Sequence, residues 1–565
     1  MKTVIVGGVA GGASAATRLR RLDEQAEIVV FEKDSYVSYA NCGLPYHIGG
    51  VIEDEELLTI NTPESLKSKF NLDVRIRQEV LGINPAAKTV SVRNLEDGTE
   101  YEETYDKLLL SPGSTCVKPN VPGIDNEKVF YLRTIPDMHR IEEFIETKHP
   151  KTAAIVGAGF VGIEVAENLV EKGIRPIIVE KATHVFQALD EDIACDVHAY
   201  LRAKKVELVL GNGLVEIQDD GEGVKLVLEN GEIQADMILM SIGMKPDNSL
   251  AKGCGLALTD RGVLIVDEHM RTSDENIYAV GDAIQVKNVI TGLDDYLPLA
   301  GPANKQGRVA ADNIAGMDTT YGGSQGTSIC KVFDMTVAWT GLSERKAKML
   351  NLSYDKAFFW SNDHASFYPN MNHISIKVIF EKPTGRILGA ELAGFDGVDK
   401  RCDTLAMAAR AHMTGHDLAQ LECCYAPPYG SAKEPINMIG FVIENILAER
   451  VKMIHWHDVD AFIAEKNPQI ADVRPVNLFM DGFIENSVSI PYEQFRKRFA
   501  KKLDKSRPVL LVCNMGLNSY NCYRILTQNG YDCYSLAGGY RLYSSMVLGT
   551  WNCEIPTYSC GLPIK

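Results

Sequence analysis

One cysteine stands out by its position in the chain. Cys42 lies in the stretch Ser38-Tyr39-Ala40-Asn41-Cys42-Gly43-Leu44-Pro45-Tyr46, which begins six residues after Glu32, an acidic side chain placed to hold a dinucleotide ribose. A single active thiol can store its oxidised state as a sulfenic acid, as a mixed disulfide with a small thiol, or as a persulfide. Cys42 is therefore the proposed chemical centre, to which other parts of the chain would bring reactants.

A glycine-rich loop precedes this stretch. An apolar predicted strand leads into Gly7-Gly8-Val9-Ala10-Gly11-Gly12, and a helix-compatible run follows over residues 13–22. Glycines here permit a tight turn and a close backbone approach, so a pyrophosphate can lie on the helix N-terminus. The next predicted strand ends at Glu32, twenty residues beyond Gly12, where a carboxylate can accept hydrogen bonds from ribose hydroxyls. The fingerprint is imperfect because Val9 occupies the usual second glycine.

A second copy of the pattern lies at mid-chain. A predicted strand leads into Gly157-Ala158-Gly159-Phe160-Val161-Gly162, and the strand after the helix ends in Glu180. An acid at this position repels a 2′-phosphate, which favours NADH over NADPH, although Lys172 and Lys181 could soften that preference. Two such folds in one chain suggest one tightly held and one exchanging dinucleotide.

The composition limits the class of protein. With 565 residues the chain is too long for one core and should form three or four domains. The apolar fraction of 45% and the charged fraction of 24% indicate a soluble globular protein. A formal net charge of -17 argues against a nucleic-acid partner, although local basic patches remain possible.

No targeting, membrane or metal signal is apparent in the sequence. No uninterrupted apolar run approaches the roughly 20 residues that span a bilayer, and the N-terminus enters a strand directly, so we expect a cytoplasmic protein without a membrane partner. Thirteen scattered cysteines indicate mostly reduced thiols. His455-Trp456-His457-Asp458 lacks further ligands at zinc-like spacing, so no metal is expected.

Five motifs in order give the chain a family resemblance. Besides the two glycine loops these are 105–113 (YDKLLLSPG), 240–246 (MSIGMKP) and 277–283 (IYAVGDA). Together they resemble a flavoprotein disulfide reductase with two dinucleotide domains, the first loop holding FAD and the second a nicotinamide. The residues expected by this resemblance to bind the cofactors are Gly7, Gly8, Ala10, Gly11, Gly12, Glu32, Lys33, Val80, Ser111, Gly113, Gly157, Gly159, Phe160, Val161, Gly162, Glu180, Gly243, Gly281, Asp282 and Ala300.

The surroundings of Cys42 separate the related families. Reductases of the glutathione-reductase type use Cys-x4-Cys, whereas the positions five residues before and after Cys42 hold Val37 and His47. Peroxide- and oxygen-reducing relatives commonly carry a histidine in the first glycine loop, where this chain has Ala10. The stretch around Cys42 is instead similar to that of coenzyme A-disulfide reductases, including those fused to a rhodanese and described as persulfide or polysulfide reductases.

This resemblance implies a set of substrate-binding residues. Cys42 would be the redox nucleophile, with the CoA thiol end at Ser38 and Asn41. Ser14, Arg18 and Arg21, spaced by four and three residues on one predicted helix face, would meet the pantetheine and the phosphates, or else form a solvated face. The remaining expected contacts are Tyr368 and Tyr425, which such families send across the dimer interface but which could equally be interface packing, and Lys433, which would contact CoA.

The C-terminal third changes character. Residues 321–448 resemble the dimerisation domain of the same superfamily, with a helix expected over 435–447. The part after a connector resembles a rhodanese domain, on three stretches: Ala471-Asp472-Val473-Arg474, a strand ending at Cys513, and Ala537-Gly538-Gly539-Tyr540. In rhodaneses, backbone N–H groups stabilise a sulfur-carrying cysteine. Many relatives carry arginine at the position of Asn518, so sulfur-transfer strength is in doubt.

The expected architecture is α/β. It comprises an FAD-binding domain (1–150 and 266–320), an NAD(P)H-binding domain (151–265), an α+β dimerisation domain (321–448), and a linker with a rhodanese-like domain (449–565). The cofactors expected are FAD and NADH, with NADPH possible and CoA as bound substrate or mixed disulfide. The partners expected are small thiols, CoA, persulfides and a second copy of the chain.

The expected activity is flavin-dependent reduction by NAD(P)H of CoA disulfide, CoA persulfide or polysulfide through one redox cysteine, with the rhodanese domain relaying sulfane sulfur. The alternative is an NADH oxidase or peroxidase with a regulatory rhodanese-like module. The sequence leaves open the physiological acceptor, including elemental sulfur, and the roles of Cys553 and Cys560.

Overall fold

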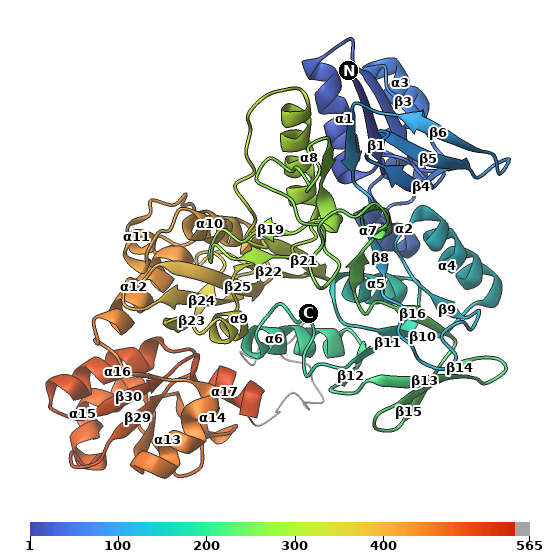
Figure 1. Cartoon of the computed structure of the whole chain (residues 1–565). Coiled ribbons are helices and arrows are strands. Elements are labelled where there is room, and N and C mark those ends of the chain that lie inside the picture. The colour runs from blue at the N-terminus through green and yellow to red at the C-terminus, as the bar shows by residue number, and fades with distance from the viewer. Residues whose placement is uncertain (548–565) are drawn as a thin grey trace. The chain divides into compact units, whose positions relative to one another are not determined.

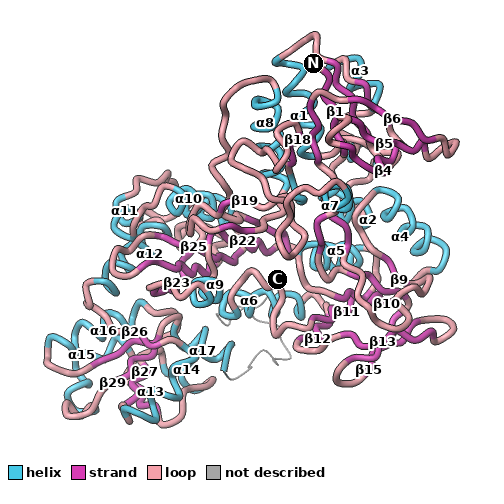
Figure 2. Tube along the Cα trace, viewed as in Figure 1, coloured by secondary structure: helices cyan, strands magenta, loops and turns pink. Residues whose placement is uncertain are grey.

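The computed structural model describes residues 1–547 and divides the chain into two compact units. Unit 1 consists of Met1–Lys181 and Asn212–Gly326, and unit 2 consists of Ala182–Gly211 and Thr327–Lys565. Both units contain helices and strands, as Figures 1 and 2 show. Cys553 and Cys560 lie outside the described residues.

The first sheet of unit 1 is parallel, with the order β18-β7-β1-β2-β3. Its buried strands have no polar alternation, which is typical of a sheet with both faces covered. Helix α1 connects β1 to β2 and packs against α8, where a Cβ atom added to Gly307 would lie 2.4 Å from the carbonyl oxygen of Gly11. The bounds are β1 Lys2–Val6, α1 Ala10–Leu22, β2 Glu27–Phe31, β3 Asp73–Arg75, β7 Lys107–Leu110, β18 Ile277–Ala279 and α8 Ala300–Ile314.

The second sheet of unit 1 repeats this design. Its parallel strands β11, β10, β16 and β9 lie side by side in this order, and α5 follows β10 as α1 follows β1. Two small antiparallel sheets are inserted in the sequence of the parallel ones: β4-β5-β6 between β3 and β7, and β13-β14-β15 between β11 and β16. The bounds are β4 Gln78–Asn84, β5 Thr89–Asn94, β6 Glu100–Thr104, β9 Val129–Phe130, α4 Ile135–Lys148, β10 Thr152–Val156, α5 Phe160–Glu171, β11 Arg175–Glu180, β13 Leu214–Asp219, β14 Val224–Leu228, β15 Glu232–Ala235 and β16 Met237–Met240.

Unit 2 contains an antiparallel sheet with the order β21-β22-β25-β24-β23. Helix α12 spans Pro435–Leu447, as the sequence predicts, with Pro435 at its first position and the Glu434 carboxylate accepting the N–H of Ile436. The other bounds are β21 Ser328–Val332, β22 Met335–Gly341, α9 Glu344–Met349, β23 Tyr354–Asn362, β24 His373–Glu381, β25 Ile387–Gly394, α10 Val398–Arg410 and α11 Gly415–Gln420.

The C-terminal part of unit 2 has a parallel sheet of its own, with the order β26-β30-β29-β27-β28. Helices cover it in the manner of an α/β domain (Figure 1). The bounds are β26 Met453–Ile454, α13 Val459–Lys466, β27 Gln469–Asp472, α14 Val476–Met480, β28 Ser487–Ser489, α15 Tyr492–Lys502, β29 Val509–Val512, α16 Leu517–Gln528, β30 Cys533–Leu536 and α17 Gly539–Val547. The α/β fold expected from the sequence is therefore confirmed.

A buried ammonium group anchors residues 182–211 within unit 2. Helix α6 (Glu191–Ala203) packs on the antiparallel sheet. Lys377 Nζ on β24, whose side chain is 1% exposed, lies 2.9 Å from a carboxylate oxygen of Asp192 and 3.0 Å from those of Asp190 and Glu344. Burial alone would lower the pKa of Lys377, but the carboxylates outweigh it and the pKa is raised well above its usual value. The ammonium is therefore held charged.

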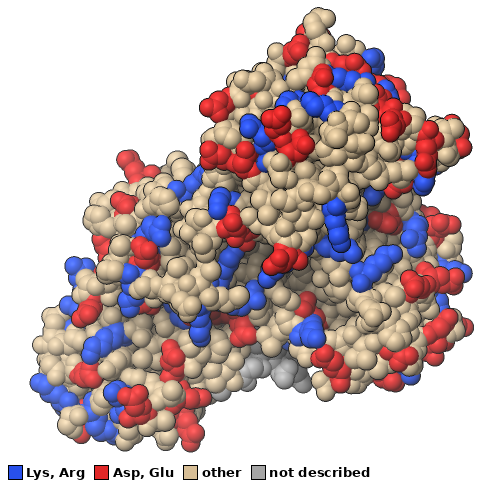
Figure 3. All heavy atoms as spheres, in the orientation of Figure 1, with Lys and Arg blue, Asp and Glu red and all other residues tan. Residues whose placement is uncertain are grey.

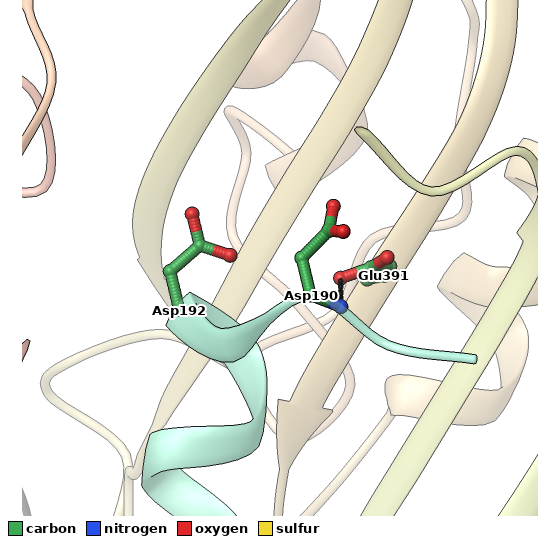
Figure 4. A group of neighbouring side chains, drawn as sticks. All are labelled: Asp190, Asp192 and Glu391. Atoms are coloured by element: carbon green, nitrogen blue, oxygen red, sulfur yellow. Dashed lines mark hydrogen bonds between the residues drawn. The ribbon is translucent and has the colours of Figure 1, made fainter. Parts of the chain in front are cut away.

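Three acidic side chains of this cluster converge in Figure 4. Asp190, Asp192 and Glu391 are the group of described residues whose oxygens lie close enough together to hold a metal ion. Lys377 Nζ already supplies a positive charge there. Burial, and then the charge of Asp190, raise the pKa of Glu391 well above its usual value, which favours its neutral form. The group is therefore better described as a charge-balanced structural cluster than as a metal site.

We predict that Lys377→Met destabilises the protein strongly, because it leaves Asp190 and Asp192 buried without their shared counter-ion, whereas Glu344 keeps its ion pair with Lys356. Loss of one partner of a buried ion pair typically costs about 3–5 kcal/mol. Urea unfolding followed by circular dichroism would measure the effect. The control is Lys382→Met, which breaks an exposed pair with Asp355 and should cost less than about 1 kcal/mol. Equal losses in the two variants would contradict the anchoring role.

Candidate functional site

Cys42 presents an exposed, free thiol beside the first glycine loop. The stretch that carries it is tied down by the backbone of Ser38, which has a left-handed conformation (φ 50°) and donates its N–H to the carbonyl oxygen of Gly8 at 2.9 Å. The short 3-10 helix Asn41–Gly43 follows and runs into α2 (Leu44–Gly49). Asn41 is exposed like Cys42. Cys42 is thus accessible to a substrate and held close to the predicted FAD loop.

The positions where a second active-site thiol would be expected are occupied otherwise. Val37 is buried against the glycine loop, where a Cβ atom added to Gly8 would lie 2.5 Å from its side chain. His47 Nδ1 lies 2.7 Å from the carbonyl oxygen of Ile52. Neither side chain can form a disulfide with Cys42.

The first glycine loop has the sterics that its sequence predicts. A Cβ atom added to Gly7 would lie 2.1 Å from the carbonyl oxygen of Ser111, and one added to Gly12 would lie 1.9 Å from that of Gly7. Glu32 accepts the N–H of Gly8 at 2.9 Å. Burial raises the pKa of the Glu32 carboxyl, while that N–H and the N–H of Asp34 oppose the rise. The loop therefore leaves its backbone open to a ligand beside a fixed carboxyl group.

The other predicted FAD motifs lie at the same edge of the sheet. β1, β7 and β18 are neighbouring parallel strands, so the loops that follow their carboxyl ends come together there. Asp282 accepts a hydrogen bond from the Ser114 hydroxyl at 2.8 Å, and the N–H of Gly281 donates to Gln306 at 2.8 Å. Ala300 begins α8 and Gly113 has a left-handed conformation. Val80 is buried on β4, whereas Lys33 is exposed, 3.5 Å from Asp247.

The second loop reproduces the geometry of the first. A Cβ atom added to Gly157 would lie 2.2 Å from the carbonyl oxygen of Ser241, and Glu180 accepts the N–H of Ala158 at 2.8 Å, as Glu32 does that of Gly8. Gly162 is equally restricted, because its Cβ would lie 2.2 Å from the Gly157 carbonyl oxygen. Gly159 instead faces open space, which leaves room for a ligand at the start of α5 with Phe160 and Val161. Gly243, also open, has a φ of 113°.

Helix α2 brings the Cys42 stretch against the second glycine loop's helix. Tyr46 on α2 donates its hydroxyl to Glu164 on α5 at 3.3 Å. Burial raises the pKa of Glu164 to about 7. Sequence reasoning missed this residue, although an acid two positions after Gly162, on a helix that must pack against a sheet, was a usable signal. The contact joins the thiol-bearing element to the predicted nicotinamide site within unit 1.

The predicted CoA-binding residues of α1 have different side-chain partners. Ser14 hydrogen-bonds Asn304 on α8, and Arg18 Nε donates to Asp312 on the same helix at 2.6 Å. The Arg21 guanidinium lies 5.5 Å from the centroid of the Phe70 ring. A ligand phosphate would therefore compete with Asp312 for Arg18 and could approach Arg21 more directly.

In unit 2 the two predicted interface tyrosines lie on joined loops. Tyr368 and Tyr425 are 43% and 50% exposed, and the N–H of Ala365 donates to the Pro427 carbonyl oxygen at 3.3 Å. Lys433 is exposed next to Glu434, whose carboxylate pairs with buried Arg401 at 2.7 Å. Two further exposed aromatic residues occur on the same loops, Phe367 and Tyr429. Such a group of exposed aromatic side chains is typical of a protein interface.

Cys513 is buried at the end of β29, in a loop that solvates its sulfur. The N–H of Gly516 lies 3.0 Å from Cys513 Sγ, and the Ser519 hydroxyl lies 3.4 Å from it. Ser535 supports Ser519 through a hydrogen bond of 2.9 Å. Asn518 is half-buried in the first turn of α16. Backbone and hydroxyl groups thus surround the sulfur even without an arginine at position 518.

The surface of the molecule is mixed in charge, with Lys and Arg interspersed among Asp and Glu on the face in Figure 3. Within residues 1–547, none of the helices combines the length and the apolar character needed to cross a bilayer.

Three family models match the chain in succession. Residues 1–307 match the pyridine nucleotide-disulphide oxidoreductase family, residues 327–435 its dimerisation domain, and residues 455–546 the rhodanese-like domain.

Individual relatives agree with these matches. A coenzyme A disulfide reductase of Staphylococcus aureus (strain bovine RF122 / ET3-1) is 35% identical over 442 residues, covering 78% of this chain and 99% of the relative. The reduced CoADR-RHD of Bacillus anthracis is similar in structure, with a TM-score of 0.94 and 44% identity over 97% of this chain and 98% of the other. A NAD-dependent persulfide reductase from A. fulgidus gives a TM-score of 0.91 and 35% identity over 96% and 100%.

The glycine cradles, the carboxyl groups beside them and these matches lead to one conclusion. The chain belongs to the pyridine nucleotide-disulphide oxidoreductase family, in the group of coenzyme A disulfide reductase relatives that carry a C-terminal rhodanese-like domain.

Proposed function

We propose that the protein uses NADH to reduce CoA disulfide and CoA persulfide through a single redox cysteine, Cys42. The observation that carries this proposal is the exposed thiol of Cys42, tied through Ser38 to the first glycine loop and without a second cysteine at either expected position. A lone thiol must take its disulfide partner from the substrate.

FAD and the nicotinamide would be held by this chain's own backbone and carboxyl groups. FAD would lie on the loop of Gly7 to Gly12 with Glu32 and Asp282, and the nicotinamide nucleotide on the loop of Gly157 to Gly162 with Glu180. When bound, FAD supplies the transfer of two electrons from the nicotinamide to sulfur. Helix α2 would keep Cys42 within reach of both loops through its contact with Glu164.

The sulfur chemistry follows from thiol–disulfide exchange. The Cys42 thiolate attacks one sulfur of CoA disulfide, a Cys42–CoA bond forms, and the other CoA leaves as a thiolate that takes up a proton. Two electrons then cleave the mixed disulfide and return Cys42 as a thiolate with release of the second CoA. Tyr368 or Tyr425, brought by a second copy of the chain, would donate a hydrogen bond or a proton to the leaving sulfur.

A homodimer follows from the same proposal. Tyr368, on the loop between β23 and β24, and Tyr425, on the loop before α12, lie in unit 2 among exposed aromatic side chains of the matched dimerisation domain. An interface between copies would bury that surface. Ser38 and Asn41 would meet the CoA thiol end, and Arg21 and Lys433 its phosphates.

The rhodanese-like domain would supply sulfane sulfur. The Cys513 thiolate attacks the outer sulfur of a persulfide R–S–SH, the new S–S bond forms as the old one breaks, and R–SH leaves with the proton, so the transfer is redox-neutral. A bound CoA thiol would accept that sulfur and present it to Cys42, where reduction releases it as hydrogen sulfide.

Replacing the nucleophile tests the central claim. We predict that Cys42→Ser lowers NADH-dependent CoA disulfide reduction by about 100-fold or more, because serine cannot form the mixed disulfide. Intact mass spectrometry of the oxidised protein should show bound CoA in the wild type and none in the variant. Cys116→Ser, which replaces a half-buried thiol elsewhere in unit 1, is the control. Full turnover in Cys42→Ser would refute the proposal, and oxygen consumption at matching rates would favour an NADH oxidase.

The coenzyme preference is tested at Glu180. We predict that Glu180→Ala shifts the ratio of kcat/KM for NADH over NADPH by about tenfold toward NADPH, since the carboxylate that repels a 2′-phosphate is removed. Steady-state kinetics with the two coenzymes measure this ratio. Glu171→Ala at the exposed end of α5 should leave it unchanged. A ratio that does not move would show that Glu180 does not contact the ribose.

The sulfur relay is tested at Cys513. We expect Cys513→Ser to lower NADH oxidation with polysulfide and free CoA at least about tenfold, because the atom that passes sulfur to CoA is lost. Cys522→Ala removes a neighbouring buried thiol on α16 and serves as the control. Unchanged turnover in Cys513→Ser would instead support a regulatory role for the rhodanese-like domain.

A further inference from the structure

The loop of Cys513 is supported by a turn that the dimerisation domain holds. Trp360 on β23 donates its indole N–H to the carbonyl oxygen of Gly538 at 3.2 Å. Its ring also carries the guanidinium of Arg541, which lies 3.4 Å from the ring centroid. Both side chains are 5% exposed. One tryptophan of the dimerisation domain therefore fixes both ends of the turn from Gly538 to Arg541.

The turn from Gly538 to Arg541 also binds the backbone of the sulfur-carrying loop. The N–H of Tyr540 donates to the carbonyl oxygen of Cys513 at 2.8 Å, and the N–H of Arg541 donates to that of Asn514 at 3.2 Å. The approach is close, because a Cβ atom added to Gly539 would lie 2.5 Å from the Cys513 carbonyl oxygen. The Arg541 side chain adds a contact of 3.6 Å to the sulfur of Met515.

These bonds determine the direction of the loop's N–H groups. In a trans peptide the carbonyl and the following N–H point in opposite directions. Because the carbonyls of Cys513 and Asn514 face α17, the N–H groups of Asn514 and Met515 face away from it. The next N–H, that of Gly516, already meets Cys513 Sγ at 3.0 Å. Successive N–H groups on one side of a loop form an anion-binding concavity that suits a thiolate or persulfide.

We propose that Trp360 and Arg541 are positioning residues for sulfur transfer at Cys513, and that the sulfur-carrying loop reaches its working shape only against the dimerisation domain. This rests on the proposed function of the rhodanese-like domain. It also explains how the loop stabilises a negative sulfur with Asn518 in place of arginine, since the loop's N–H groups are directed by the turn and a guanidinium lies at Met515.

The test uses the full-length holoenzyme with Trp360→Leu, Trp360→Phe and Arg541→Lys. Alkylation of Cys513, followed by peptide mass spectrometry against pH, reports how well the loop stabilises the thiolate and needs neither NADH nor CoA. We expect Trp360→Leu, which removes the ring and its N–H, and Arg541→Lys, which replaces the planar guanidinium on that ring, to move the midpoint to higher pH and to lower sulfur loading from polysulfide about tenfold. Trp360→Phe keeps a ring but loses the N–H donor, so its shift should be intermediate.

The controls are Trp456→Phe in the connector and Arg524→Lys on α16, which are expected to alkylate like the wild type. Wild-type alkylation profiles and sulfur loading in both Trp360→Leu and Arg541→Lys would overturn the inference. If Trp360→Leu fails to fold, judged by FAD content, Trp360→Phe and Arg541→Lys decide alone. A shifted profile with unchanged turnover of polysulfide and free CoA would uphold the loop's dependence on Trp360 while refuting the sulfur relay, so the two failures are distinguishable.

Discussion

The buried Lys377 ammonium is the constraint that most shapes this chain. It binds Asp190 and Asp192 of the segment 182–211 to the antiparallel sheet of unit 2. That segment leaves unit 1 directly after the second glycine loop's strand and returns at Asn212, whose N–H donates to the carbonyl oxygen of Glu180 at 3.1 Å. Glu180, the proposed ribose-binding residue, thus lies next to the start of the segment 182–211, which Asp190 and Asp192 bind to Lys377. The desolvation cost of such a cluster offsets much of its Coulomb attraction, whereas loss of one partner leaves a buried charge uncompensated.

The parts of the fold that the sequence predicts well are those set by local sterics. Gly7, Gly12, Gly157 and Gly162 each have a backbone oxygen where a Cβ atom would lie, so the two loops are recognisable without knowledge of the rest. The predicted bounds of helix α12 match the structure, and a proline at its first position explains the start. Helix α1, by contrast, begins at Ala10 rather than at residue 13, since its first turn is made of the loop glycines themselves.

What the sequence does not reveal are contacts between distant segments. Lys377 and Trp360 have no motif around them, Glu164 follows the second glycine loop, and each of the three acquires its role from a partner more than a hundred residues away. The α1 residues illustrate the same limit in the other direction. Their spacing predicts one helix face but not the partners on it: Arg18 is paired with Asp312, while the Arg21 guanidinium lies over the Phe70 ring. Helical periodicity fixes the face of a side chain, whereas its partner depends on the packing of the neighbouring helix.

The contrast between the two sulfur sites fits the proposed division of labour. Cys42 is exposed, as a thiol must be to attack a substrate as large as CoA disulfide, and the partner atom it needs arrives with that substrate. Cys513 is buried and its sulfur meets the N–H of Gly516 and the hydroxyl of Ser519, which suits a stored persulfide that must persist between turnovers. A loop that directs successive N–H groups toward one side brings their partial positive charges together. Other contacts must therefore hold such a loop in shape. The proposed contact of Trp360 with the turn from Gly538 to Arg541 supplies this support from the dimerisation domain. It gives a physical reason for joining the rhodanese-like domain to the reductase by a fixed contact as well as by a linker.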